Sequence, residues 1–127
     1  MTVDQYLASI KARLLSDPAI LDFRIVRERL TLTDAHLRVR LTLTDASRLE
    51  FSEYAQRAIS GKIEVVTYSY HWADAEDNLI RRWDNTPHFP NLPNFPHHIH
   101  LGSTDKVEPG QPVDFFAVLD MIVQHLS

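Results

Sequence analysis

Side chains able to move protons near neutral pH are concentrated in one stretch of this chain, residues 68–102. Histidine titrates close to neutral pH, so it can serve as a general acid or a general base. Five of the seven histidines lie in this stretch, together with both tryptophans and two adjacent arginines. We therefore expect any functional site to lie here, with five candidate catalytic residues: His71, His88, His97, His98 and His100.

The run His97-His98-Ile99-His100 offers an acid and a base within four residues. In an extended segment His98 and His100 point to the same face, whereas His97 points to the opposite one. With His71 or His88 added, three histidines could instead bind a metal ion such as zinc. The spacing matches no strong metal motif such as HExxH, so we predict neither a metal nor another cofactor. A purely structural role for these histidines is the third reading.

Two arginines in this stretch are candidate substrate contacts. Arg81 and Arg82 are adjacent in an expected strand, so their side chains point to opposite faces of the sheet. An arginine on a covered face needs an anionic partner, because an unpaired buried charge is unfavourable. The commoner partner is an acidic residue such as Asp84, and the functional one is a phosphate, which guanidinium binds bidentately. Both readings stay open.

Aromatic residues alternate with small or polar ones just before the arginines. Tyr68, Tyr70 and Trp72 share one face of an expected strand, and Trp83 lies across from them in the next. Such an arrangement is typical of a cross-strand aromatic ladder, since strands are rich in aromatic residues. The alternative is a platform on which nucleic-acid bases stack. In that case Tyr70 and Trp83 are substrate-binding residues.

The order of periodic patterns predicts an α+β fold. Helical spacing of apolar residues predicts an N-terminal helix over residues 2–16, which ends at Asp17-Pro18. Alternating patterns then predict an antiparallel meander of about five strands, clearest over residues 36–44. A face switch near Arg27–Arg29 indicates a β-bulge, and residues 53–61 could either continue a strand or form a short helix.

A proline-rich loop and a second helix complete the expected fold. Prolines recur every third residue from Pro87 to Pro96, a period that favours an extended polyproline-II path. Residues 97–102 could form an edge strand or a loop, and Asp114 is placed to cap a C-terminal helix packed on the sheet. No linker or repeat interrupts the chain, so we predict a single domain over residues 1–127.

Composition limits the classes of function. A formal net charge of −4 argues against broad nucleic-acid binding but allows a local basic site. The chain has no cysteine, which excludes disulfides and thiolate metal sites and suits the cytoplasm. Its N-terminus lacks an apolar signal region, and no apolar run approaches the roughly 20 residues that span a bilayer. We therefore expect a cytoplasmic protein that does not enter a membrane.

Residues 79–102, LIRRWDNTPHFPNLPNFPHHIHLG, resemble the signature of the TumE-like toxins of prokaryotic toxin–antitoxin modules. That signature is a strand ending in R-W-D-N, a P-H-H-P-like turn, a P-x-F-P-H-H-x-H-x-G segment and a short C-terminal helix. The Y-x-Y-H-W of residues 68–72 also looks familial. Phe89 departs from the pattern, because the family usually has a second histidine there. The fitting positions are Trp83, Asp84, Asn85, Pro87, His88, Pro90, Phe95, Pro96, His97, His98, His100 and Gly102.

The resemblance implies a toxin made beside a small antitoxin, which we expect to be a helix-turn-helix protein. The expected order of a helix followed by a meander is also similar to small ribonuclease-toxin folds, so we expect RNA as the target. One of the three clustered histidines (His97, His98, His100) would act as general base, and His71 or His88 as general acid. Arg81 or Arg82 would stabilise the phosphate in the transition state, without a metal ion.

Two other classes stay open at this stage. The protein could be a non-enzymatic binding module, whose histidine- and proline-rich loop is structural or docks a partner protein. It could also be a metal-dependent nuclease or hydrolase. Self-association into a homo-oligomer is compatible with each of these readings.

Overall fold

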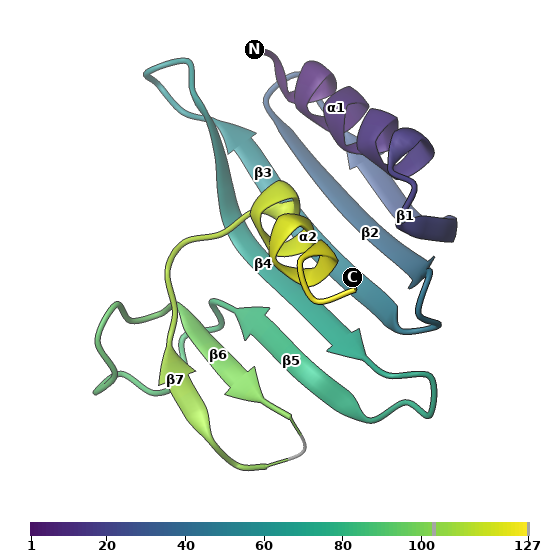
Figure 1. Cartoon of the computed structure of the whole chain (residues 1–127). Coiled ribbons are helices and arrows are strands. Elements are labelled where there is room, and N and C mark those ends of the chain that lie inside the picture. Colours follow the sequence, from purple (N-terminus) through teal and green to yellow (C-terminus); the bar gives the residue numbers. More distant parts are fainter. Residues whose placement is uncertain (103, 127) are drawn as a thin grey trace.

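A computed structural model of the chain describes residues 1–102 and 104–126, which form two helices and one seven-stranded sheet (Figure 1). Each strand pairs antiparallel with the next one along the chain. The elements are α1 (Val3–Ser16), β1 (Ile20–Leu30), β2 (Asp34–Leu43), β3 (Arg48–Arg57), β4 (Ile63–Ala73), β5 (Leu79–Asp84), β6 (His98–Leu101), β7 (Val107–Pro109) and α2 (Phe115–Val123).

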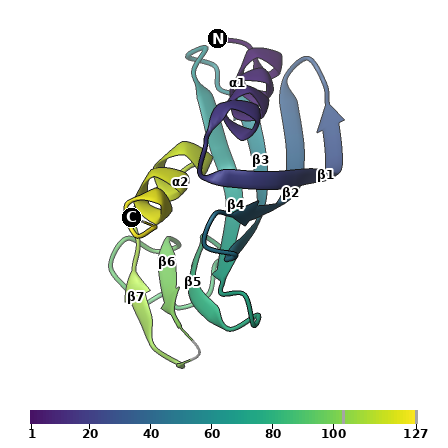
Figure 2. The same cartoon turned by 45° about the vertical axis from the view of Figure 1, so that its right-hand side comes forward.

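Both helices pack on the same face of the sheet (Figures 1 and 2). Alternation along the strands decides which residues they cover: Leu37, Val39 and Leu41 of β2 are buried beneath them, as are the alternate residues of β3 and β4. The intervening side chains, such as those of Arg38 and Arg40, point to the other face. No described helix lies over that second face, which we call the open face.

Both helices begin where the sequence indicates. Thr2 caps α1 in a capping box with Gln5: its hydroxyl accepts a hydrogen bond from the Gln5 backbone N–H at 3.1 Å, and the Gln5 side chain accepts one from the Thr2 N–H at 2.8 Å. Asp114 caps α2 by accepting from the backbone N–H of Ala117 at 2.9 Å. The expected α+β class with a helix at each end is confirmed.

The sheet has seven strands, so the expected number of about five is too low. β6 forms because residues 98–101 pair with β5, and β7 then pairs with β6. β7 is only three residues long, which is too short for an alternating pattern to reveal it in the sequence. The segment 53–57 continues β3 instead of forming a helix.

The proline-rich segment between β5 and β6 is a series of tight turns, so the expected polyproline-II path is wrong. Hydrogen bonds close these turns about every three residues, from Leu92 N to Phe89 O (3.1 Å), Phe95 N to Leu92 O (3.3 Å) and His97 N to Asn94 O (3.0 Å). Phe89 and Asn94 have positive φ angles of 58° and 62°. Proline presets the φ of a turn as readily as that of an extended helix, so its spacing alone did not separate the two.

The expected bulge lies in β1. Ile25 pairs with Val39 but Arg27 pairs with Arg38, so that Val26 is an extra residue in the ladder. One extra residue reverses which face the following side chains occupy. Arg27 therefore points to the open face, whereas Glu28 faces α1.

A buried carboxyl group ties both helices to the sheet. Glu53 of β3 is 2% exposed and accepts three hydrogen bonds: from the Tyr6 hydroxyl of α1 at 2.5 Å, the Tyr70 hydroxyl of β4 at 2.7 Å and the backbone N–H of Phe115 in α2 at 2.7 Å. Burial is the largest influence on its pKa, which lies above the ordinary glutamate value despite these donors. The hydrogen bond from the Phe115 N–H fixes where α2 begins above the sheet.

Candidate functional site

A row of charged and titratable side chains crosses five strands of the open face. Directly paired positions place Arg40 of β2 beside Glu50 of β3, Glu50 beside His71 of β4, His71 beside Arg82 of β5, and Arg82 beside His100 of β6. Paired positions share one face of a sheet, at a spacing of about 5 Å. The meander thus aligns one residue from each of five consecutive strands.

Two depressions hollow the open face, and they meet at Glu50 and His71. The larger, of about 720 Å³, extends towards β1 and is also lined by Asp22, Arg24, Arg40, Arg48 and Asp77. The smaller, of about 420 Å³, extends towards β5 and is also lined by Arg38, Ser52, Ser69 and Arg82. His71 is half-buried and borders both. A ligand in either depression would meet its imidazole.

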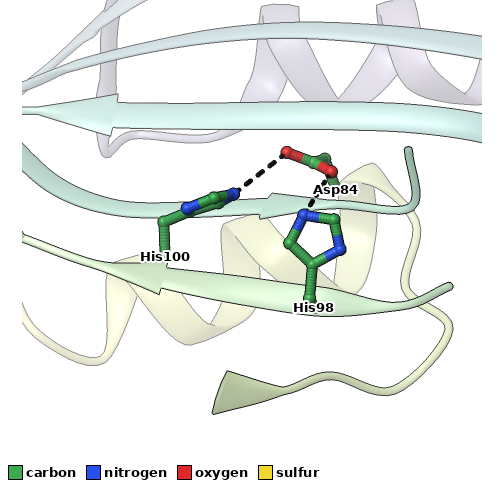
Figure 3. A group of neighbouring side chains, drawn as sticks. All are labelled: Asp84, His98 and His100. Carbon is green, nitrogen blue, oxygen red and sulfur yellow. Dashed lines mark ion pairs between the residues drawn. The ribbon is translucent and has the colours of Figure 1, made fainter. Parts of the chain in front are cut away.

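At the β5–β6 end of the row, the carboxylate of Asp84 contacts Arg82, His98 and His100, and Figure 3 shows Asp84 with the two histidines. Asp84 accepts a hydrogen bond from Arg82 Nε at 2.9 Å, and its oxygens lie 2.8 Å from His98 Nε2 and 3.6 Å from His100 Nε2. The Asp84 side chain is 5% exposed, so solvent screens these contacts little. Asp84 thereby holds the guanidinium of Arg82 in place, whereas its distance to His100 is too long for a hydrogen bond.

His98 is the buried member of this group. Its Nδ1 lies 2.9 Å from the carbonyl oxygen of Pro96, where it donates a hydrogen bond. Its Nε2 faces Asp84 but meets no described group in hydrogen-bond geometry. A histidine held in this way by a backbone carbonyl is also how proteins present a metal ligand, so Asp84, His98 and His100 could together hold a divalent ion.

His100 is the accessible member, with its side chain 29% exposed. Partial burial is the largest cause that lowers the pKa of His100 below the ordinary value, and nearby His98, Arg82 and His88 act in the same direction. The carboxylate of Asp84 opposes them. His100 is therefore set up to be neutral, and able to accept a proton, at neutral pH.

The other two candidate histidines do not belong to the row. His97 points to the helix-covered side, where its Nδ1 lies 2.8 Å from the Tyr68 hydroxyl and its ring stacks on Tyr68 at 5.8 Å. His88 is exposed in the loop and contacts the ring of Phe89, which in turn covers His98 and His100. The expectation that His98 and His100 share a face and His97 does not is confirmed.

The candidate substrate contacts also divide between the two faces. Arg82 points to the open face, while Arg81 lies over the ring of Trp83 at 5.8 Å on the other side. Tyr70 is 0% exposed and Trp83 is 3% exposed, both within the core beneath the helices. Tyr70 contacts the rings of Tyr68 and Phe51, and the ring of Trp83 contacts Arg81. Burial therefore leaves neither ring exposed to a substrate.

Sequence reasoning missed part of this site. Asp84 was expected only as an ion-pair partner for an arginine, and Glu50 was not singled out at all. The alternation of β3 could have placed Glu50 on the open face, because Leu49 and Phe51 beside it are clearly apolar. Its position beside His71 depends on the pairing register, which the sequence does not state.

A comparison with known protein families matches residues 10–126 to the family described as Toxin TumE. The chain belongs to the TumE toxin family. The resemblance seen in residues 79–102 is therefore confirmed over nearly the whole chain. Membership indicates the toxin of a toxin–antitoxin module and implies an antitoxin as its partner. Comparisons with curated proteins and with solved structures gave no match.

The R-W-D-N run of this TumE toxin has a distinct structural role at each of its last three positions. Trp83 fills the core, Asp84 organises the site, and Asn85 ties the following loop to β4. The Asn85 side chain accepts from Tyr68 N at 3.0 Å and donates to Val66 O at 2.9 Å, so it extends the β4–β5 pairing beyond the end of the strand. Among the described residues, no helix is long and apolar enough to cross a membrane.

Proposed function

We propose that this TumE toxin cleaves RNA by a metal-independent transesterification on the open face, with His100 as general base and His71 as general acid. Arg82 would hold the phosphate between them. The observation that carries the proposal is the row His71–Arg82–His100, in which an arginine is flanked by a histidine on each neighbouring strand. The two backbones on either side of Arg82 are about 10 Å apart, twice the spacing of adjacent strands.

This spacing suits an in-line reaction at phosphorus. His100 would take the proton of a ribose 2′-hydroxyl, whose oxygen attacks the phosphorus, while the bond to the 5′-oxygen breaks and that oxygen receives a proton from His71. The products are a 2′,3′-cyclic phosphate and a free 5′-hydroxyl. The Nε of Arg82 is held by Asp84, and no described group is bonded to its two terminal nitrogens, which can bind the phosphate oxygens bidentately.

Asp84 and His98 are positioning residues in this proposal, because burial keeps both from a substrate. Arg81, His88 and His97 have no catalytic part in it. Arg81 and His97 lie on the covered side, and His88 is an exposed loop residue near His100 that does not belong to the row. The proposal therefore narrows five candidate histidines to two.

The acid limb of the pH profile tests the role of His100. A general base must be neutral, and the pKa of His100 is lowered from 6.5, so we expect kcat/KM to rise through a limb that lies below pH 6.5. Asp84 raises this pKa, so Asp84→Asn should move the limb to still lower pH and also lower the plateau, since Arg82 loses its anchor. A limb above pH 6.5, or one that Asp84→Asn leaves in place, would contradict the assignment.

Cleavage in the presence of a chelator separates this proposal from metal catalysis. We expect the purified protein to cleave RNA at an undiminished rate in EDTA. Activity that is lost in EDTA and restored by a divalent ion would instead assign Asp84, His98 and His100 to a catalytic metal.

The partner we propose is a helix-turn-helix antitoxin encoded beside the toxin. The second candidate function is a binding module without catalysis, because two of the histidines already have partners within the fold. His98 contacts Pro96 and Asp84, and His97 contacts Tyr68. His71 and His100 are the observation against it, since both remain partly exposed along the row with arginines.

A further inference from the structure

We propose that the open face over β1 and β2 binds the sugar–phosphate backbone of a single-stranded RNA several nucleotides away from the cleavage site. Five arginines, which we call the arginine face, form this surface: Arg24, Arg27 and Arg29 of β1 with Arg38 and Arg40 of β2. The inference rests on the proposed action on RNA and adds the class of substrate. A polynucleotide would reach both the arginine face and the row at His71, whereas a mononucleotide would not.

The bulge in β1 creates the arginine face. Before it, Phe23 and Ile25 pack against the core, so Arg24 between them points to the open face. Simple alternation would then send Arg27 and Arg29 towards α1. The extra residue reverses this, so that both arginines lie on the open face, and Glu28 instead pairs with Lys11 of α1.

The resulting cross-strand neighbours are pairs of like charge. Arg24 pairs directly with Arg40, and Arg27 with Arg38. Like charges at directly opposed positions destabilise a sheet, so these arginine pairs do not serve to stabilise the fold. An anion bound across each pair would relieve the repulsion, and phosphate is an anion that guanidinium groups bind bidentately.

Fewer acidic groups than arginines lie on this surface. Asp22 lines the larger depression together with Arg24, and Asp34 interacts with Arg29. Glu50 alone pairs with both Arg38 (2.6 Å) and Arg40, so one carboxylate is shared by two guanidinium groups. Arg24 and Arg27 are exposed and have no ion pair within the described part of the chain. This part of the surface is therefore locally basic, although the whole protein has a formal charge of −4.

The arginine face is continuous with the proposed catalytic row. Arg24 and Arg40 line the larger depression together with His71, and Arg38 lines the smaller one with His71 and Arg82. β1 and β5 are four strand spacings apart, about 19 Å, so the bound chain must be several nucleotides long. Depressions of 720 and 420 Å³ have the size of small-molecule sites, so each is large enough for an unpaired nucleotide of the bound strand.

Binding of RNA to a double variant tests the proposal. In a catalytically inactive His100→Ala background, Arg24→Gln with Arg27→Gln should weaken binding of a single-stranded RNA of about 12 nucleotides. Because two phosphate contacts are removed, the slope of log K against log salt should become shallower by about 1.4. With His100 restored, the same double variant should lower kcat/KM more for the 12-nucleotide RNA than for a dinucleotide, which is too short to reach both β1 and the row.

Arg57→Gln with Lys62→Gln is the matched control, since it removes the same charge at the exposed β3–β4 hairpin. It should leave the salt slope unchanged. The proposal would be overturned if both double variants lost the same RNA affinity, or if the arginine-face variant bound RNA like the wild type. It would also be overturned if polyglutamate displaced the RNA as well as unlabelled RNA does. Failure of the catalytic proposal would be recognised separately, as cleavage that survives loss of His71 and His100 while RNA binding still depends on Arg24 and Arg27.

Discussion

Replacing either His71 or His100 by alanine should lower the rate of RNA cleavage by about 10²–10⁴-fold, the contribution of a positioned acid or base. Each residue transfers a different proton in the proposed reaction, so neither can replace the other. The loss should appear in kcat for purified protein acting on a dinucleotide, and as loss of growth arrest when the variant is expressed. The double variant should be little worse than either single one, since residues that act as a unit are not additive.

Two histidine variants outside the row serve as controls. His97→Ala removes the ring that stacks on Tyr68, and His125→Ala removes an exposed ring that touches only the edge of Trp72 among described aromatic rings. Both should keep cleavage within a few-fold of the wild-type rate. If His97→Ala abolishes cleavage while His100→Ala retains it, the base has been assigned to the wrong face of β6.

Glu53→Leu should destabilise the fold more than any substitution in the site. It would leave two tyrosine hydroxyls and the Phe115 N–H without their acceptor in the core. Each buried donor that loses its partner costs about 1–3 kcal/mol, so we expect the free energy of unfolding to fall by roughly 4 kcal/mol or more. Urea unfolding followed by tryptophan fluorescence measures this loss, since Trp72 and Trp83 are both buried.

Glu53→Gln is the informative companion, because it keeps the volume and one acceptor oxygen. The pKa of Glu53 is raised in the folded protein, so this group favours folding most below its unfolded pKa and loses that contribution as pH rises through the folded pKa. Glu53→Gln should remove this dependence and cost less stability than Glu53→Leu. Equal losses for the two variants, at all pH values, would show that hydrogen bonding at this position is unimportant.

Much of the fold could be predicted from local patterns. The capping residues Thr2 and Asp114, the alternation over residues 36–44 and the bulge after Ile25 are all signals carried by neighbouring residues. β7 and the turns of the proline-rich segment escaped prediction. A three-residue strand has no measurable period, and a proline preset for a turn looks the same in sequence as one preset for an extended path.

The site was predicted less completely than the fold, for a related reason. Alternation correctly separated His98 and His100 from His97, because that depends only on the strand. Which residues meet across strands depends on register, and register is set by turns and bulges far from the residues concerned. The register of the β3–β4 and β4–β5 pairings is what places Glu50, His71 and Arg82 side by side.

Cleavage of a matched pair of substrates tests the central proposal most directly. One is a short single-stranded RNA, and the other is the same RNA with a 2′-deoxynucleotide at the cleaved position. We expect the first to give a 2′,3′-cyclic phosphate and a 5′-hydroxyl in EDTA, and the second to remain intact, because it lacks the oxygen that His100 would deprotonate. Cleavage of the deoxy substrate, or products ending in a 5′-phosphate, would contradict the proposed reaction at His71, Arg82 and His100.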